Sequence, residues 1–276
     1  MEKTPLGNEI IQIISREIKD LRKKNNVVNT ILRNDVFALL ESQNCTVLYY
    51  PLDDEIKGFR VRKYVNGCDE DFVYINTAKP EDIQIFTAAH ELGHLINIDV
   101  TVCSELNMND VSKKMREDII DRFAAELLME KSAFAMSFDV QIHDYVDDDG
   151  MVSGRDMIKA IVFLMDFFMV PYDAVVERLY ETKRIGKKYR DYLLDKAIVS
   201  ESLIENAIKE GKYKRLKPTG IKSFGELPHY LKELSDVGEI NERRMQDIMK
   251  IFDIKEFDDV PEVDNIQLEK DIEDVQ

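Results

Sequence analysis

The chain has 276 residues, 44% of them hydrophobic and 33% charged, and its formal net charge is −16. This length can hold one large domain or two small ones with a real core, and the negative charge argues against direct binding to nucleic acid. No secretory signal is recognised, and the longest apolar run (160–170) is too short to cross a bilayer. The three cysteines, Cys45, Cys68 and Cys103, show no paired spacing. We therefore expect a cytoplasmic protein with reduced thiols and no membrane contact.

The amino-terminal segment, residues 8–44, is predicted to form one or two helices. Apolar residues recur at helical spacing on both sides of Asn25-Asn26, which is the expected break. These residues, 1–44, form the first of three predicted regions and are expected to pack on a core that follows them.

Three strand candidates come next, at residues 46–50, 59–65 and 72–76. Asn66-Gly67 is a hairpin signal, although the gap before Phe72 predicts a longer loop. The segments predict a small antiparallel sheet whose last strand could pair, as an edge, with an extended substrate. Asn76 ends that strand, where it could cap a turn or bind substrate backbone.

Residues 81–96 are predicted to form a buried helix that begins after Pro80 and carries the sequence His90-Glu91-Leu92-Gly93-His94. Side chains four residues apart lie one above the other on a helix, so both imidazoles can reach one zinc ion. Glu91 then lies beside the metal, where the general base for a zinc-activated water belongs. Gly93 could let another element pack closely below the site. The alternative is two surface histidines at helical spacing by accident.

A catalytic zinc ion needs a third protein ligand. The pattern with a third histidine requires Gly and His where this chain has Asn97 and Val100, which excludes that class. A carboxylate from a second helix is the remaining common choice.

Residues 111–136 are predicted to form that second helix, with Asn109 and Asp110 as caps. Glu117 and Asp121 are four residues apart on its apolar stripe, where carboxylates are costly to bury without a cation. We therefore predict Glu117 as the third ligand and Asp121 as the acceptor that orients a ligating histidine. The alternative is a solvated face on which Arg116 and Arg122 pair with these acids.

An acidic stretch, residues 144–150, fails the pattern of a calcium loop and is predicted to be a surface loop. His143 beside it could donate a hydrogen bond to a tetrahedral intermediate if the loop folds over the cleft; an exposed loop histidine is the alternative. Helices are predicted again at residues 153–168 and 172–183.

The last predicted region, residues 187–276, is a helical accessory extension. Residues 251–276 hold ten acidic side chains against Lys255 and Lys270. This charge favours basic partners, and the alternative is a partly disordered tail that aids solubility. The predicted fold class is α+β: a small antiparallel sheet packed on a zincin-type active-site helix, mostly helical elsewhere.

The metal motif with its flanks resembles the ImmA/IrrE family of metallopeptidases, over about residues 45–186. The similar segments are 72–76, 86–94, 117–129 and 168–179. The resemblance implies a gluzincin-like zinc domain at 45–186, with His90, His94 and Glu117 on zinc and Glu91 as base. It also implies a protein substrate, of the class of basic helix-turn-helix repressors. Glu130 replaces a proline, and Ile120 a small residue, that are common in the family.

These residues predict a zinc metalloendopeptidase in which Glu91 moves a proton from water to the departing amine. Two alternatives remain open: a zincin-shaped regulator that sequesters a partner without cutting it, and a hydrolase that acts on a small amide. An intact Glu91 argues against the first.

Overall fold

The structure is a computed structural model that describes residues 6–52, 55–65, 68–224 and 227–252. The chain divides into two compact units, Met1–Ile221 and Lys222–Gln276. The predicted region boundaries at 44/45 and 186/187 both fall inside the first unit. The predicted acidic tail lies outside the described residues from 253 onward, as do the two residues of the Asn66-Gly67 hairpin signal.

The first unit combines three strands with ten helices in its described residues. In chain order these are α1 (Asn8–Lys24), α2 (Asp35–Glu41), β1 (Cys45–Tyr50), β2 (Gly58–Val65), β3 (Cys68–Asn76), α3 (Glu81–Leu95), α4 (Ile98–Glu105), α5 (Lys113–Leu128), α6 (Lys131–His143), α7 (Gly154–Phe168), α8 (Tyr172–Glu181), α9 (Lys187–Leu194) and α10 (Glu201–Glu210). This composition confirms the predicted α+β class.

The second unit, described by itself, contains the short strand β4 (Ser223–Phe224) and the helices α11 (Leu227–Asp236) and α12 (Glu242–Ile251). The two helices pack against each other. The Asn241 side chain caps α12 by accepting a hydrogen bond from the backbone N–H of Arg244 at 2.9 Å.

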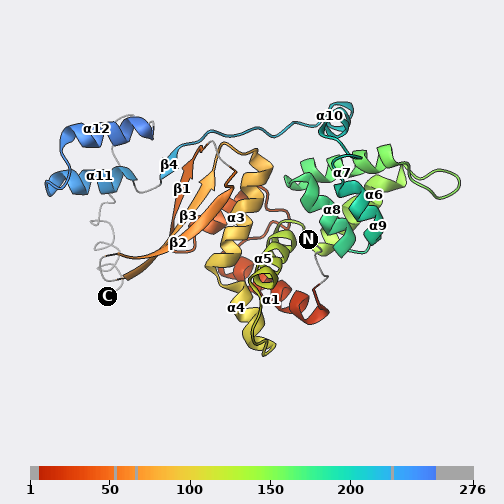
Figure 1. Ribbon diagram of the computed structural model, residues 1–276, viewed down its shortest axis with the longest axis horizontal. Coiled ribbons are helices and arrows are strands. Elements are labelled where there is room, and N and C mark those ends of the chain that lie inside the picture. Colours follow the sequence, from red (N-terminus) through yellow and green to blue (C-terminus); the bar gives the residue numbers. More distant parts are fainter. Residues whose placement is uncertain (1–5, 53–54, 66–67, 225–226, 253–276) are drawn as a thin grey trace, which may run out of the picture. The chain divides into compact units, whose positions relative to one another are not determined.

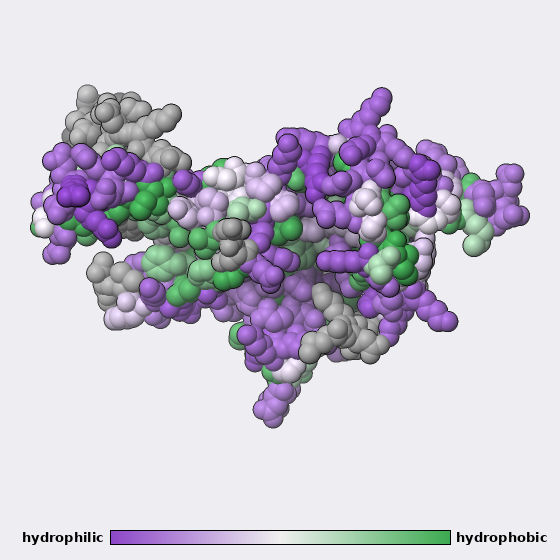
Figure 2. Space-filling model, turned by 45° about the horizontal axis from the view of Figure 1, so that its top comes forward, coloured by the Kyte–Doolittle hydropathy of each residue, from purple (hydrophilic) through white to green (hydrophobic). Residues whose placement is uncertain are grey.

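The helix α3 lies between the sheet and α5 (Figure 1). It is apolar on most of its surface, and Ile85, Ala88, Ala89 and Leu92 are fully buried, which explains why its sequence shows no single apolar stripe. The helices α6 to α10 form a second group, in which α7 contacts α6, α8 and α10. Hydrophilic residues cover most of the described surface on the face drawn in Figure 2. No helix within the described ranges is both long and apolar enough to span a bilayer.

The sheet is mixed, so the predicted antiparallel pairing is wrong in part. The strand β3 is central: it pairs antiparallel with β2 and parallel with β1, in the order β2-β3-β1. Alternating apolar residues report which face of a strand is buried but not the direction of its neighbour. Because β3 is paired on both sides, it cannot be the predicted edge for a substrate, and β2 has that position instead.

The strand β3 also begins earlier than predicted. It starts at Cys68, and its acidic residues lie opposite basic residues of β2: Asp71 faces Arg62, and Glu70 faces Lys63. Cross-strand pairs of opposite charge stabilise a sheet and here offset the low strand propensity of the acids. The longer loop expected before Phe72 is therefore wrong.

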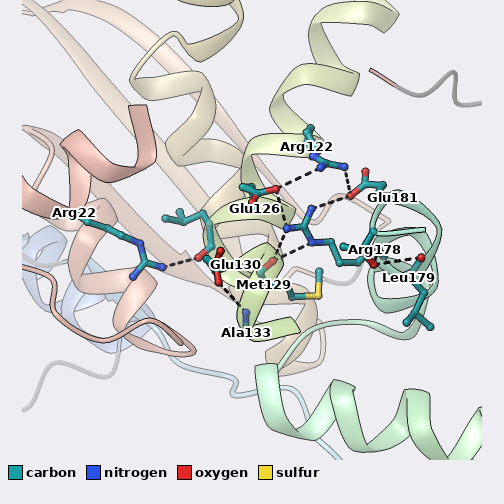
Figure 3. A network of polar contacts seen from close by, with 11 residues as sticks. Arg22, Arg122, Glu126, Met129, Glu130, Ala133, Arg178, Leu179 and Glu181 are labelled. Carbon is teal, nitrogen blue, oxygen red and sulfur yellow. Dashed lines mark hydrogen bonds and ion pairs between the residues drawn. The ribbon is translucent and has the colours of Figure 1, made fainter. Parts of the chain in front are cut away.

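The second metal-site helix ends sooner than predicted, because the expected helix 111–136 is two helices. Ser112 caps α5 by accepting from Met115 N at 3.2 Å, and α5 ends at Leu128. The Arg178 guanidinium donates twice to the carbonyl oxygen of Met129, at 2.9 and 2.7 Å, which satisfies this end of the helix (Figure 3). Glu130 then caps α6 by accepting from Ala133 N at 2.8 Å. A carboxylate thus starts α6 where the family commonly has proline.

The Arg178 side chain is fully buried and belongs to a balanced ionic network that joins α5 to α8 (Figure 3). It lies 2.8 Å from Glu126 and 3.3 Å from Glu181, and Arg122 pairs with the same two carboxylates. Two guanidinium groups and two carboxylates therefore compensate one another in the interior, as buried charges require.

Candidate metal centre

The histidine pair comes from the carboxyl-terminal half of α3. Glu81 and Asp82 in the first turn suit the positive end of the helix dipole, and the helix begins after Pro80 as predicted. His90 and His94 lie one turn apart on one face, with their Nε2 atoms 3.2 Å apart. Both rings are partly exposed, at 22% and 30%, so a ligand or a water molecule can reach them.

Glu117, on the second turn of α5, completes a triangle with the two imidazoles. Its Oε2 lies 3.5 Å from His90 Nε2 and 3.5 Å from His94 Nε2. Among the described residues this is the one group of three side chains placed to share a metal ion.

The size of the triangle tests whether these residues fit zinc. Zinc–nitrogen and zinc–oxygen bonds of about 2.0–2.2 Å set the edges of a ligand tetrahedron at roughly 3.3–3.6 Å. The three measured edges, 3.2, 3.5 and 3.5 Å, lie close to that range. Two neutral nitrogens and one carboxylate oxygen are also a donor set that zinc accepts, and a triangle leaves a fourth position for solvent.

Asp121 lies one turn after Glu117 and contacts His90 from the opposite side of the ring. Its Oδ1 is 3.0 Å from His90 Nδ1, which fixes the tautomer that leaves Nε2 free to bind a metal. The arginines of the alternative are engaged with other acids: Arg116 binds Asp99 at 2.8 Å, and Arg122 joins the network beside Arg178.

The pKa values of the two histidines are shifted in opposite directions. Burial disfavours protonation of His90, but the hydrogen bond and charge of Asp121 outweigh it and raise the pKa of His90. Burial, together with the neighbouring His90, lowers the pKa of His94. His94 is therefore the readier of the two to lose its proton to a metal ion.

Glu91 is only 5% exposed, whereas the side chains of His90 and His94 are 22% and 30% exposed. Burial raises the pKa of its carboxyl group to about 7, with a further contribution from the charge of Glu117. A carboxyl group with a pKa near neutrality can both accept and donate a proton.

Gly93 allows α5 to approach the back of the histidine helix. A Cβ at this position would lie 3.0 Å from Phe123 Cδ1 and 3.1 Å from Ile120 Cγ2. These contacts bear out the hypothesis that the missing side chain permits close packing below the site. Ile120, where the family commonly has a smaller residue, takes up part of that space.

One residue of the site was missed by the sequence analysis. Arg60, on β2, donates from Nη1 to the carbonyl oxygen of His94 at 2.7 Å and from Nε to Asp71 at 2.8 Å. It ties the edge strand to the end of the metal-site helix. The signal available in sequence was the alternation of Arg60 with Arg62, which places both on one face of the strand.

The two remaining predicted residues lie elsewhere. Asn76 is fully buried, and its amide accepts from Leu52 N at 3.0 Å and donates to the carbonyl oxygens of Leu52 and Ile56 at 3.0 and 2.7 Å. These are the turn-capping contacts of the alternative role. His143 is exposed at the end of α6, in the helix group beyond α5 (Figure 1). The group that shares a metal position does not include it.

Comparison with known proteins gives one family. The model of the peptidase M78 family, described as an IrrE N-terminal-like domain, matches residues 40–180. No curated protein matches the chain. A solved structure of a Mycobacterium tuberculosis transcriptional regulator is similar at 15% identity and a TM-score of 0.43, over 63% of this chain and 47% of that one. The chain thus spans about half the length of that structure.

Proposed function

The chain belongs to the ImmA/IrrE family, peptidase M78, and on this premise we propose that it is a zinc-dependent metalloendopeptidase that cuts a peptide bond in a regulatory protein. The observation that carries the proposal is the triangle of His90, His94 and Glu117 with the buried Glu91 beside it. We place the catalytic domain at residues 45–186, with the helices of 1–44 packed on it and 187–276 as an accessory region.

The proposed mechanism assigns one task to each side chain. His90, His94 and Glu117 would hold zinc, which supplies polarisation of the scissile carbonyl and acidification of a water molecule. Glu91 accepts a proton from the attacking water and passes it to the amide nitrogen of the departing chain. Asp121 holds the ring of His90 in place through Nδ1.

The strand β2 is the proposed place for an extended substrate. It is the edge strand next to β3 and contacts α3, so a segment that pairs with it by main-chain hydrogen bonds would run beside the histidine helix. Arg60 holds this strand to His94. We propose that this bond sets the distance between the substrate backbone and the metal position.

The proposed substrate is a basic helix-turn-helix repressor. The net charge of −16 supports it, because a negative surface attracts a basic partner and repels nucleic acid. The family resemblance supports the same class. The odd number and unpaired spacing of the cysteines, Cys45, Cys68 and Cys103, favour a cytoplasmic location.

The test combines metal analysis with a cleavage assay. We expect Glu91→Gln to keep its zinc and lose cleavage, because only the proton carrier is removed. Glu117→Ala should lose zinc, whereas Asp118→Asn, on the same helix, should keep both properties. The assay incubates the protein with a helix-turn-helix repressor from a neighbouring gene, and intact-mass analysis should report two fragments if it is cleaved.

Two results would contradict the proposal. Full zinc occupancy in Glu117→Ala would place the third ligand elsewhere. A stable mass-shifted complex without fragments, unchanged by Glu91→Gln, would indicate a protein that sequesters its partner.

A further inference from the structure

The edge strand β2 is fixed to the metal-site helix at two points. Gly58 lets the strand lie against α3, because a Cβ at this position would be 2.5 Å from Thr87 Cγ2. Two residues later, Arg60 donates to the carbonyl oxygen of His94 at 2.7 Å. Since Thr87 and His94 lie on either side of His90 in the sequence, β2 runs along the turn of α3 that carries the two histidines (Figure 1).

These two contacts define the faces of β2. Side chains alternate between the two faces of a strand, so the positions of Gly58 and Arg60 face α3. Phe59 and Val61 therefore lie on the opposite face of the sheet. A peptide that pairs with this edge has its side chains alternately on the metal side and on the side of Phe59.

The opposite face of β2 carries an apolar row at the edge of the sheet. Phe59 is 43% exposed, and its ring lies against Tyr74 of β3, with the ring centroids 5.0 Å apart. Val61 follows on the same face and is partly buried. Lys63, opposite Glu70 of β3, ends the row. Exposed apolar side chains on an edge strand favour pairing with another chain, and soluble proteins usually avoid them.

The position of this row beside the histidines favours a substrate segment as the chain that pairs with it. Phe59 is next to Arg60, which binds the backbone of His94. At this level of β2, the main chain of a paired segment therefore lies beside the metal group. Its side chains on the opposite face contact Phe59 and Val61, and apolar or aromatic cross-strand neighbours stabilise such a pairing.

We propose that Phe59 and Val61 form a subsite that selects aliphatic or aromatic side chains at two alternate positions of the substrate, close to the bond that is cut. This inference rests on the proposed peptidase function and adds a sequence preference to it. Because Phe59 lies on the face away from α3, the preference acts on substrate binding and not on proton transfer at Glu91. One apolar cross-strand pair is worth up to about fivefold in affinity.

The test is a cleavage profile on a mixture of random-sequence peptides, with the full chain supplied with zinc and the products identified by mass spectrometry. We expect the wild type to favour aliphatic or aromatic residues over alanine by up to about fivefold at each of two alternate subsites. Phe59→Lys should favour acidic residues at one of them and keep the apolar preference at the other. Val28→Lys places the same charge between α1 and α2, on a residue that is 92% exposed, and should leave the profile unchanged.

Steady-state kinetics on one peptide selected from the mixture separate substrate contact from structural support. Phe59→Lys should raise KM by up to about fivefold and leave kcat unchanged. Phe59→Leu, which keeps an apolar side chain, should have the KM of the wild type. A fall in kcat at unchanged KM in Phe59→Lys would overturn the inference, because Phe59 would then support the site without contacting the substrate.

Failure of this inference can be told from failure of the proposed function. If the wild type cuts neither the peptides nor the repressor, the peptidase function is wrong and the inference falls with it. Cleavage of the repressor alone, cleavage of peptides without an apolar preference, or a preference that Phe59→Lys leaves unchanged overturns the inference alone. A second copy of this chain is the other occupant of such an edge. Self-association that Phe59→Lys abolishes in sedimentation, with an unchanged cleavage profile, would likewise overturn the inference.

Discussion

Replacement of Asp121 by asparagine tests the link between α5 and the histidine pair. The carboxylate lies 3.0 Å from His90 Nδ1, the geometry of a charge-assisted hydrogen bond. Loss of such a partner behind a ligating histidine typically weakens metal binding by about 10–100-fold, or roughly 1.4–2.7 kcal/mol. The Asp121 side chain is 32% exposed, and solvent screening places the expected loss near the lower end, about tenfold.

The assay is a competition titration of zinc between the protein and a chromophoric chelator. Asp118→Asn makes the same change of charge three residues earlier on α5 and should leave the affinity for zinc unchanged. The free energy of unfolding of the metal-free variant should lie within about 1 kcal/mol of that of the wild type, since a partly exposed ion pair contributes little to folding. Wild-type zinc affinity in Asp121→Asn would refute the reasoning, because the negative charge at His90 Nδ1 would then contribute nothing to metal binding.

Two further predictions concern packing and charge near the site. Gly93→Ala gains about 1 kcal/mol of helix propensity, but it places a methyl group 3.0 Å from Phe123. Because overpacking costs about 1–3 kcal/mol, we expect the free energy of unfolding, measured with a denaturant, to fall. A more stable variant would show that α3 and α5 do not approach so closely. Hydrogen bonds from Arg62, and then from Arg60, lower the pKa of Asp71 below its ordinary value of 3.8. The stability that this carboxylate contributes is therefore present above pH about 4 and is lost as pH falls through its lowered pKa. In Asp71→Asn, stability followed by circular dichroism should fall less steeply below pH about 4 than it does in the wild type or in Asp69→Asn. Identical profiles would contradict the assignment of this acid-dependent stability to Asp71.

The placement of the ligand set could be predicted because each part of it is local. Two histidines one turn apart, and two carboxylates one turn apart, share a helix face whatever the rest of the chain does. The structure brings His90, His94, Glu117 and Asp121 together. Their roles in catalysis stay predictions until metal and activity are measured.

The features that could not be predicted depend on contacts between distant residues. The end of α5 after Leu128 is stabilised by Arg178, which donates to the carbonyl oxygen of Met129, 49 residues away in the chain. No local pattern around Met129 predicts this contact. The parallel pairing of β1 with β3 likewise depends on residues distant in the chain, and the alternation of apolar residues in a strand does not predict which strand it pairs with. Arg60 acts on a helix carbonyl 34 residues later in the chain. Its role is visible only once β2 lies against α3.

The contacts that hold α5 predict that the positions of the site residues do not depend on a bound metal ion. On one side, Gly93 lets Phe123 and Ile120 pack against α3, and both side chains are fully buried. On the other side, Arg178 and its carboxylate partners join α5 to α8 through a buried network (Figure 3). Glu117 and Asp121 therefore project from a helix that is fixed by a large core, in contrast to small zinc domains whose folding depends on the ion. We therefore predict that the free energy of metal binding is not spent on folding the domain, and that removal of a bound metal ion leaves the arrangement of α3 and α5 in place.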